Sequence, residues 1–138
     1  MNLASAIREN VKAALKEDSG GGDLTAKLIS TSARAKAKVV AREEAVLCGA
    51  AWFEACFRNL DPKVKIHWRL HDGDTIRAGQ VLCEISGETR AMLTAERPAI
   101  NFLQMLSATA TVTRHYIEAV KGAGAAIMDT RKTLPGLR

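Results

Sequence analysis

The sequence has few aromatic residues, few cysteines and no long uncharged apolar run. Phe, Trp and Tyr make up 4% of the 138 residues, whereas hydrophobic residues of all kinds make up 47%, so we expect a core of aliphatic side chains. No apolar segment approaches the ~20 residues that a helix needs to cross a bilayer, which argues against a membrane protein. The three cysteines form no CxxC pair, which argues against a zinc site or a disulfide scaffold and for reduced thiols in a cytoplasmic protein.

The charge of the chain is positive overall. It carries 20 Lys and Arg residues against 15 Asp and Glu residues, a formal net charge of +5 and a sequence pI of about 9.4. This balance favours anionic partners such as phosphates, polycarboxylates or nucleic acid. Residues 1–18 contain three acidic side chains and no apolar region of the kind that precedes a cleavage site, so they do not read as a secretory signal peptide.

Hydrophobic periodicity predicts a chain that mixes helices and strands. Leu3, Ile7 and Val11 recur at helical spacing, whereas Val64 and Ile66 belong to a segment that alternates apolar and charged residues, as half-buried strands do. The predicted elements, in chain order, are a helix over 2–18, a strand over 33–42, a helix over 49–60, strands over 64–70 and 81–85, a helix over 94–120 and a strand over 125–128.

This order predicts an α+β fold with an N-terminal domain over residues 1–112 and the opening of a second domain over 113–138. The short apolar run at 125–128 is typical of a buried strand in a parallel sheet or barrel. A parallel strand needs neighbours that are reached through crossover connections, and the sequence holds no residues to supply them. We therefore expect the chain to be the N-terminal part of a longer protein.

The first candidate binding site is a cation near the start of the long predicted helix. Thr94 is a plausible N-cap, and Pro98 is tolerated in a first turn because its missing N–H has no intrahelical acceptor there. A cation in the first turn is disfavoured by the helix dipole by roughly 0.3–1 kcal/mol, so Arg97 should have an anionic partner. That partner is either Glu96 or a bound carboxylate or phosphate, and the spacing does not decide between them.

The second candidate binding site follows the apolar run at 125–128. Thr130, Arg131, Lys132 and Thr133 place two cations between two hydroxyls, where barrels and open sheets bind ligands at the carboxyl ends of their strands. Arg supplies a bidentate fork and Lys a point charge, which suits an anion. The alternative is a solvated basic loop. We favour the ligand site because the following Pro-Gly pair would hold the loop in place.

Two segments resemble signatures of quinolinate phosphoribosyltransferases, also called carboxylating nicotinate-nucleotide pyrophosphorylases. Residues 129–138 read DTRKTLPGLR and resemble the family segment DTRKTxPGLR. Residues 94–111 read TAERPAINFLQMLSATAT and resemble AERxxLNxLxxLSGIAT, with Ile100 in place of Leu and Ala108-Thr109 in place of Gly-Ile. The GDLT segment at 22–25 also has a counterpart near the N-terminus of the family.

The resemblance implies an enzyme of NAD biosynthesis, a pentosyltransferase. Such an enzyme joins quinolinate to phosphoribosyl pyrophosphate in the presence of Mg²⁺ and yields nicotinate mononucleotide, pyrophosphate and CO₂. The resemblance also implies an N-terminal α/β open sandwich, an antiparallel sheet with helices, followed by the first strand of an incomplete α/β barrel. We expect the residues that bind Mg²⁺ and perform catalysis to lie in the remainder of that barrel, so that this chain alone is inactive.

The resemblance further implies a homodimer, or a larger assembly of dimers, with substrate sites shared between subunits. The N-terminal domain of one subunit would cover the barrel mouth of the other. By this correspondence Arg97 contacts quinolinate in the neighbouring subunit's site. Thr130, Arg131 and Lys132 bind substrate in their own subunit.

Three other functions compete with this interpretation. A related phosphoribosyltransferase with a different ring substrate is the nearest. A biotinyl or lipoyl carrier module is suggested by the hairpin over residues 70–85, but the hairpin has no lysine at its tip. Nucleic-acid binding is suggested by Arg34, Lys36, Lys38 and Arg42, but aromatic residues are not interleaved with them, and we expect no nucleic-acid partner.

Overall fold

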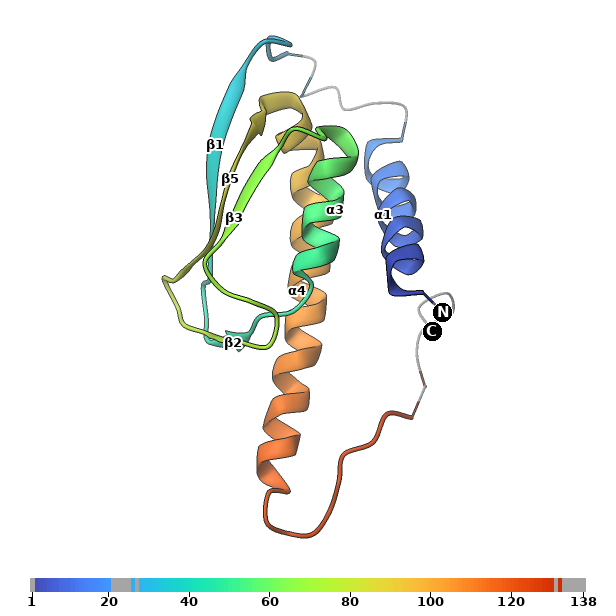
Figure 1. Ribbon diagram of the computed structural model, residues 1–138, viewed down its shortest axis with the longest axis vertical. Helices are drawn as coiled ribbons and strands as arrows, with labels where there is room; N and C mark the ends of the chain where they lie inside the picture. The colour runs from blue at the N-terminus through green and yellow to red at the C-terminus, as the bar shows by residue number, and fades with distance from the viewer. Residues whose placement is uncertain (1, 21–25, 27, 131, 133–138) are drawn as a thin grey trace.

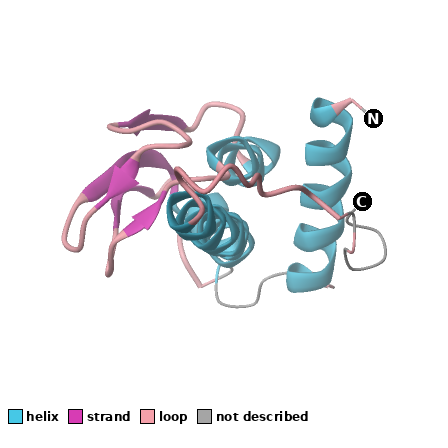
Figure 2. Ribbon diagram, turned by 90° about the horizontal axis from the view of Figure 1, so that it is seen from below, coloured by secondary structure: helices cyan, strands magenta, loops and turns pink. Residues whose placement is uncertain are grey.

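The computed structural model describes residues 2–20, 26, 28–130 and 132, and it places three helices on one side of an antiparallel sheet (Figures 1 and 2). This layering confirms the predicted α+β fold. The elements, in chain order, are α1 (Leu3–Ser19), β1 (Arg34–Val40), β2 (Ala45–Val46), α3 (Ala50–Leu60), β3 (Lys65–Trp68), β4 (Thr75–Ile76), β5 (Val81–Glu88) and α4 (Thr89–Ala119).

The main sheet has three strands in the order β1-β5-β3, and a separate two-stranded ribbon pairs β2 with β4. Both pairings of β5 are antiparallel: Ala37 lies opposite Ile85, and Ile66 lies opposite the same residue from the other side. Because residues opposite one another share a face of a sheet, Val39, Ile85 and Ile66 of the three strands lie on the face that packs against the core. The predicted alternation over 64–70 is confirmed, since Ile66 is half-buried and His67 is exposed.

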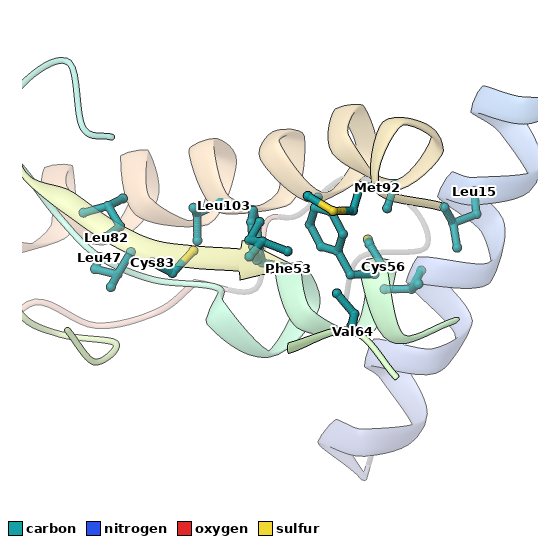
Figure 3. Packing of buried hydrophobic residues seen from close by; sticks show 14 of the residues in the cluster. Leu15, Leu47, Phe53, Cys56, Val64, Leu82, Cys83, Met92 and Leu103 are labelled. Atoms are coloured by element: carbon teal, nitrogen blue, oxygen red, sulfur yellow. The ribbon is translucent and has the colours of Figure 1, made fainter. Parts of the chain in front are cut away.

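The core lies between the sheet, α3 and α4 (Figure 3). Phe53 of α3 is fully buried, and its ring centroid is 5.0 Å from that of Phe57 and 5.3 Å from that of Trp68 on β3. Met92 and Leu103 reach toward α3 from the opposite side. The buried stripe of α4 follows helical spacing and consists of Met92, Ala95, Pro98, Ala99, Leu103 and Ser107.

The start of α3 is capped by a residue far away in sequence. Gly49 is the N-cap and has no side chain to accept a hydrogen bond from the first turn. Asp72 takes that role: its two carboxylate oxygens accept from the backbone N–H of Gly49 and Ala50, each at 3.1 Å. The predicted turn at 71–74 therefore positions a helix, and its Gly73 has the expected positive φ of 97°.

The long helix begins earlier than predicted. β5 runs directly into α4, whose N-cap is Glu88 and whose first residue is Thr89, so Thr94 is not an N-cap. Pro98 lies inside the helix and is buried. The local signals were outweighed because Met92 and Ala95 are buried in the core, which stabilises helix N-terminal to the proline.

The predicted strand over 125–128 is not formed. Residues 121–130 are exposed and have no strand assignment, with Ile127 46% and Met128 81% exposed. A β-strand is stabilised by hydrogen bonds to a neighbouring strand, and within the described residues no strand lies beside this segment to form them. The segment leads from the end of α4 back in the direction of α1 (Figure 1).

The distal half of α4, residues 105–119, extends beyond the sheet (Figure 1). Several of its apolar side chains are exposed. Met105, Val112, Tyr116 and Ile117 are each between 49% and 61% exposed, so the prediction of burial on several sides holds only for the proximal half. The helix is continuous across the domain boundary predicted at 112 and 113, and that boundary stays a prediction. No helix among the described residues is both long and apolar enough to cross a membrane.

Candidate functional site

Arg97 lies in the third turn of α4, not in the first. Its side chain is 76% exposed, and its Nη1 donates to Oδ1 of Asp18 at 3.0 Å. The anionic partner that the sequence called for is therefore present, but it is Asp18 in the last turn of α1 and not the adjacent Glu96. The predicted conflict with the helix dipole does not arise, because that effect is confined to the terminal turn.

The position of Asp18 is fixed by the packing of α1. Val11 and Leu15 of α1 are buried in the common core, and Asn10 accepts a hydrogen bond from Nε1 of Trp52 on α3 at 3.3 Å. These contacts hold the end of α1 beside the proximal half of α4. Arg90, two turns before Arg97 on the same face of α4, donates from Nε to the carbonyl of Ile29 at 2.6 Å. Two arginines of one helix face thus hold the chain at Asp18 and at Ile29.

The second predicted site lies only partly within the described residues. Thr130 and Lys132 are exposed and outside any regular element, whereas Arg131 and Thr133 lie outside the described residues. No hydrogen bond or ion pair in the described part of the chain joins Arg97 to Thr130 or Lys132. The structure therefore leaves the two cationic segments separate. Their joint action in one substrate site stays a prediction.

Two hydroxyl residues of the family signature at 94–111 have a structural role that the sequence analysis did not identify. The Ser107 hydroxyl accepts from the backbone N–H of Cys48 at 3.0 Å and donates to the Cys48 carbonyl at 3.1 Å. The Thr111 hydroxyl, one turn later, accepts from the N–H of Val46 at 2.8 Å and donates to the Ser107 carbonyl at 2.7 Å. The signal was present in the sequence as two hydroxyl residues at i and i+4 on one helix face. They attach α4 to β2 and to the segment that follows it, so their role in the described structure is to hold α4 in place.

The outer face of the sheet carries the lysines that suggested nucleic acid. A shallow hollow of about 340 Å³ lies there and is lined by Lys36, Lys38, His67, Glu84 and Ser86 among others. Glu84 in its centre is 2.9 Å from Arg69 and 3.7 Å from Lys38. The hydrogen bond from Arg69, followed by its charge, lowers the pKa of Glu84. Part of the positive charge is thus balanced within the sheet, which supports a solvated face.

Neither a reactive cysteine nor a cluster of metal ligands is found among the residues that the structure describes. The three cysteines are free, and burial raises the pKa values of Cys56 and Cys83 to about 12, so neither is a thiolate nucleophile. Cys48 is half-buried, and the pKa of its thiol is also raised, first by burial and then by the charge of Asp72. Among the described residues no three His, Cys, Asp or Glu side chains gather into a metal site.

Comparison with known proteins matches most of the chain to one enzyme family. The family described as "Quinolinate phosphoribosyl transferase, N-terminal domain" matches residues 23–107, and "Quinolinate phosphoribosyl transferase, C-terminal domain" matches residues 109–138. A mitochondrial quinolinate phosphoribosyltransferase (decarboxylating) of Nicotiana tabacum is 37% identical over 134 residues, which are 96% of this chain and 38% of that protein. A probable carboxylating nicotinate-nucleotide pyrophosphorylase of Bacillus subtilis is 39% identical over 88% of this chain and 42% of that protein.

Solved structures agree with the sequence relatives. The nicotinate-nucleotide pyrophosphorylase of Francisella tularensis superposes with a TM-score of 0.90 at 36% identity over 96% of this chain and 48% of that chain. The corresponding enzyme of Ehrlichia chaffeensis superposes with a TM-score of 0.86 at 34% identity over 94% of this chain and 47% of that chain. This chain spans about two fifths of the curated relatives and just under half of each solved chain. With one family domain matched over residues 23–107 and the next beginning at 109, the chain belongs to the quinolinate phosphoribosyltransferase family.

Proposed function

We propose that this chain contributes to a quinolinate phosphoribosyltransferase of NAD biosynthesis. The enzyme converts quinolinate and phosphoribosyl pyrophosphate to nicotinate mononucleotide, pyrophosphate and CO₂. The observation that carries the proposal is the position of Arg97: it lies in the family signature, on a rigid helix, with a side chain that is 76% exposed. An exposed arginine on a fixed element is suited to binding a carboxylate of a soluble substrate.

The chemistry of the substrates explains the need for cations in both segments. Quinolinate is a dicarboxylate and the other substrate carries a pyrophosphate, so the two repel each other unless positive groups lie between and around them. In the proposal Arg97 binds a quinolinate carboxylate. Thr130, Arg131 and Lys132 bind substrate from the other side, with Lys132 supplying a compact charge and Thr130 a hydroxyl donor.

The proposal includes an arrangement of subunits. The enzyme is a homodimer, or an assembly of dimers, in which Arg97 of one subunit reaches the site that contains Thr130, Arg131 and Lys132 of its neighbour. The apolar side chains exposed on the distal half of α4 support an assembly of some kind, because a surface of this sort is usually covered by another element or chain. The 138-residue chain spans just under half of the solved chains that it matches, and in this proposal it has no transferase activity by itself.

Mg²⁺ belongs to the proposal as the counter-ion of phosphoribosyl pyrophosphate. When bound, it neutralises charge on the departing pyrophosphate. The described residues do not gather a metal-ligand set, so no residue of this chain is assigned to it. We place the enzyme in the cytoplasm because its three cysteines are free thiols. The relatives named as mitochondrial or chloroplastic come from plants.

The test is a calorimetric titration of quinolinate into the full-length protein and into the 138-residue chain. The proposal predicts binding by the full-length protein, turnover after addition of phosphoribosyl pyrophosphate and Mg²⁺, and neither property in the chain alone. Loss of binding in Arg97→Ala, with an unchanged unfolding midpoint, would support the assigned role. A full-length protein that folds but does not bind quinolinate would contradict the proposal and leave a related ring substrate as the explanation.

A further inference from the structure

The contact between Asp18 and Arg97 joins two helices through a single guanidinium nitrogen. Oδ1 of Asp18 accepts from Nη1 at 3.0 Å, and no other hydrogen bond of Arg97 is present in the described part of the chain. A guanidinium carries five N–H donors arranged along two usable edges. The edge formed by Nε and Nη2 is therefore open for a bidentate carboxylate while Asp18 holds the opposite side of the group.

The carboxylate of Asp18 has no local reason to be where it is. It lies in the last turn of α1, where the negative end of the helix dipole disfavours an acidic side chain. Its side chain is nevertheless only 25% exposed, whereas that of Arg97 is 76% exposed. The carboxylate of Asp18 is thus a partly sheltered anchor, and Arg97 is an exposed side chain that it holds.

The anchor itself is rigid. Residues Val11 and Leu15 bury α1 in the core, and Arg90 fixes the chain at Ile29 by its bond to the carbonyl of that residue. A free arginine side chain samples many rotamers, and ordering it when a ligand binds costs affinity. A fixed carboxylate that already restricts the guanidinium reduces this cost.

We propose that Asp18 is a positioning residue for quinolinate binding: it holds the Arg97 guanidinium in the orientation that receives a substrate carboxylate. The inference rests on the function proposed above, since it requires Arg97 to bind the dicarboxylate. Asp18 does not touch the substrate and acts only through Arg97. Its removal weakens the binding of quinolinate and leaves the binding of phosphoribosyl pyrophosphate unchanged.

The experiment measures steady-state kinetics of the full-length enzyme for both substrates in five forms: wild type, Asp18→Ala, Asp18→Asn, Arg97→Ala and the double variant Asp18→Ala/Arg97→Ala. Glu17→Ala is the matched control, because Glu17 is the adjacent acidic residue of α1 and is exposed. Asp18→Asn is included because it keeps an oxygen acceptor and the size of the side chain, so it remains informative if Asp18→Ala unfolds. Unfolding midpoints are recorded for every form.

We expect Asp18→Ala to raise the KM for quinolinate about 2- to 10-fold, because this is the loss of affinity that follows from having to order one flexible side chain on binding. The KM for phosphoribosyl pyrophosphate and the unfolding midpoint should match those of Glu17→Ala. Asp18→Asn should show a smaller rise. The double variant should be no worse than Arg97→Ala alone, because residues that act as a unit are not additive.

Three results would overturn the inference. A lower KM for quinolinate in Asp18→Ala would mean that Asp18 competes with the substrate for Arg97. Equal changes for both substrates, together with a lower unfolding midpoint, would mean a purely structural contact. No effect in either Asp18 variant, while Arg97→Ala raises the KM, would remove Asp18 from binding and leave the proposed function intact. If Arg97→Ala itself has no effect on quinolinate, the role of Arg97 fails first, and the two failures are distinguished.

Discussion

Gly49 lies where the start of α3 meets α4, and its replacement by alanine tests that contact quantitatively. Its φ is +106°, a conformation that costs an L-residue roughly 1–2 kcal/mol. A Cβ at this position would lie 2.8 Å from Cδ1 and 3.2 Å from Cβ of Leu106 on α4. Overpacking of this kind typically costs about 1–3 kcal/mol. We therefore expect Gly49→Ala to lower the free energy of unfolding by about 2–5 kcal/mol.

The matched control is Gly79→Ala. Gly79 has a φ of +80°, but a Cβ there would meet no atom within 4 Å, so only the conformational cost of about 1–2 kcal/mol applies. Urea denaturation of the chain followed by circular dichroism measures both variants, and the difference between them reports the clash with Leu106. In a Leu106→Ala background the loss caused by Gly49→Ala should shrink. Equal losses in the two glycine variants would refute the close approach of α3 to α4.

Three further predictions follow from the same structure. Ser107→Ala leaves the N–H and carbonyl of Cys48 without their partner and should lower the free energy of unfolding, measured by urea titration, by about 1–3 kcal/mol. Thr109→Ala is the control: the exposed Thr109 hydroxyl bonds only within α4, so its loss should change the free energy of unfolding by less than about 0.5 kcal/mol. The pKa of Asp61 is lowered chiefly by the hydrogen bond from the Glu88 N–H, so the carboxylate stabilises the fold above its unfolded pKa, and this stability is lost as pH falls through the folded pKa. Asp61→Asn should therefore flatten the acid limb of a plot of unfolding free energy against pH, and an unchanged limb would contradict this. Cys56 and Cys83 should resist a thiol reagent at neutral pH until the chain unfolds, and rapid labelling of the native chain would contradict their burial.

The sequence predicted those elements whose signals agree with their packing. The helix over 2–18 and the strand over 64–70 were correct to within about two residues, because their apolar spacing matches the faces they bury. The fold class followed from the order of such elements. The Gly73 turn was also predicted, since its positive φ is the property that glycine supplies.

The sequence failed where a distant contact decides the structure. Thr94 and Pro98 imitate the start of a helix, but α4 begins at Thr89 because the side chains before the proline are buried in the core. The apolar run at 125–128 imitates a buried strand, but no described strand pairs with it. A local pattern does not reveal whether the partner of an element is present.

The candidate site shows the same division. An anionic partner of Arg97 was expected and is present, but the helix-dipole argument for it was wrong, because Arg97 lies in the third turn of α4 and not in the first. The identity of that partner was not predicted, because Asp18 is 79 residues away in sequence and reaches Arg97 only through the packing of α1. Asp72, which caps α3 from 22 and 23 residues away, was missed for the same reason.

We propose that Arg97 of one subunit and Lys132 of another serve the same quinolinate site. If so, two inactive variants that each lack one of these side chains should restore activity when their subunits pair. We expect the full-length Arg97→Ala and Lys132→Ala variants each to be inactive or nearly so. When the two are co-expressed with different tags, random pairing makes about half of the dimers mixed, and each mixed dimer contains one intact site. We expect the pool to recover about a quarter of wild-type turnover, all of it in the mixed dimers. Two variants that stay inactive when mixed, although they form mixed dimers, would contradict the shared site.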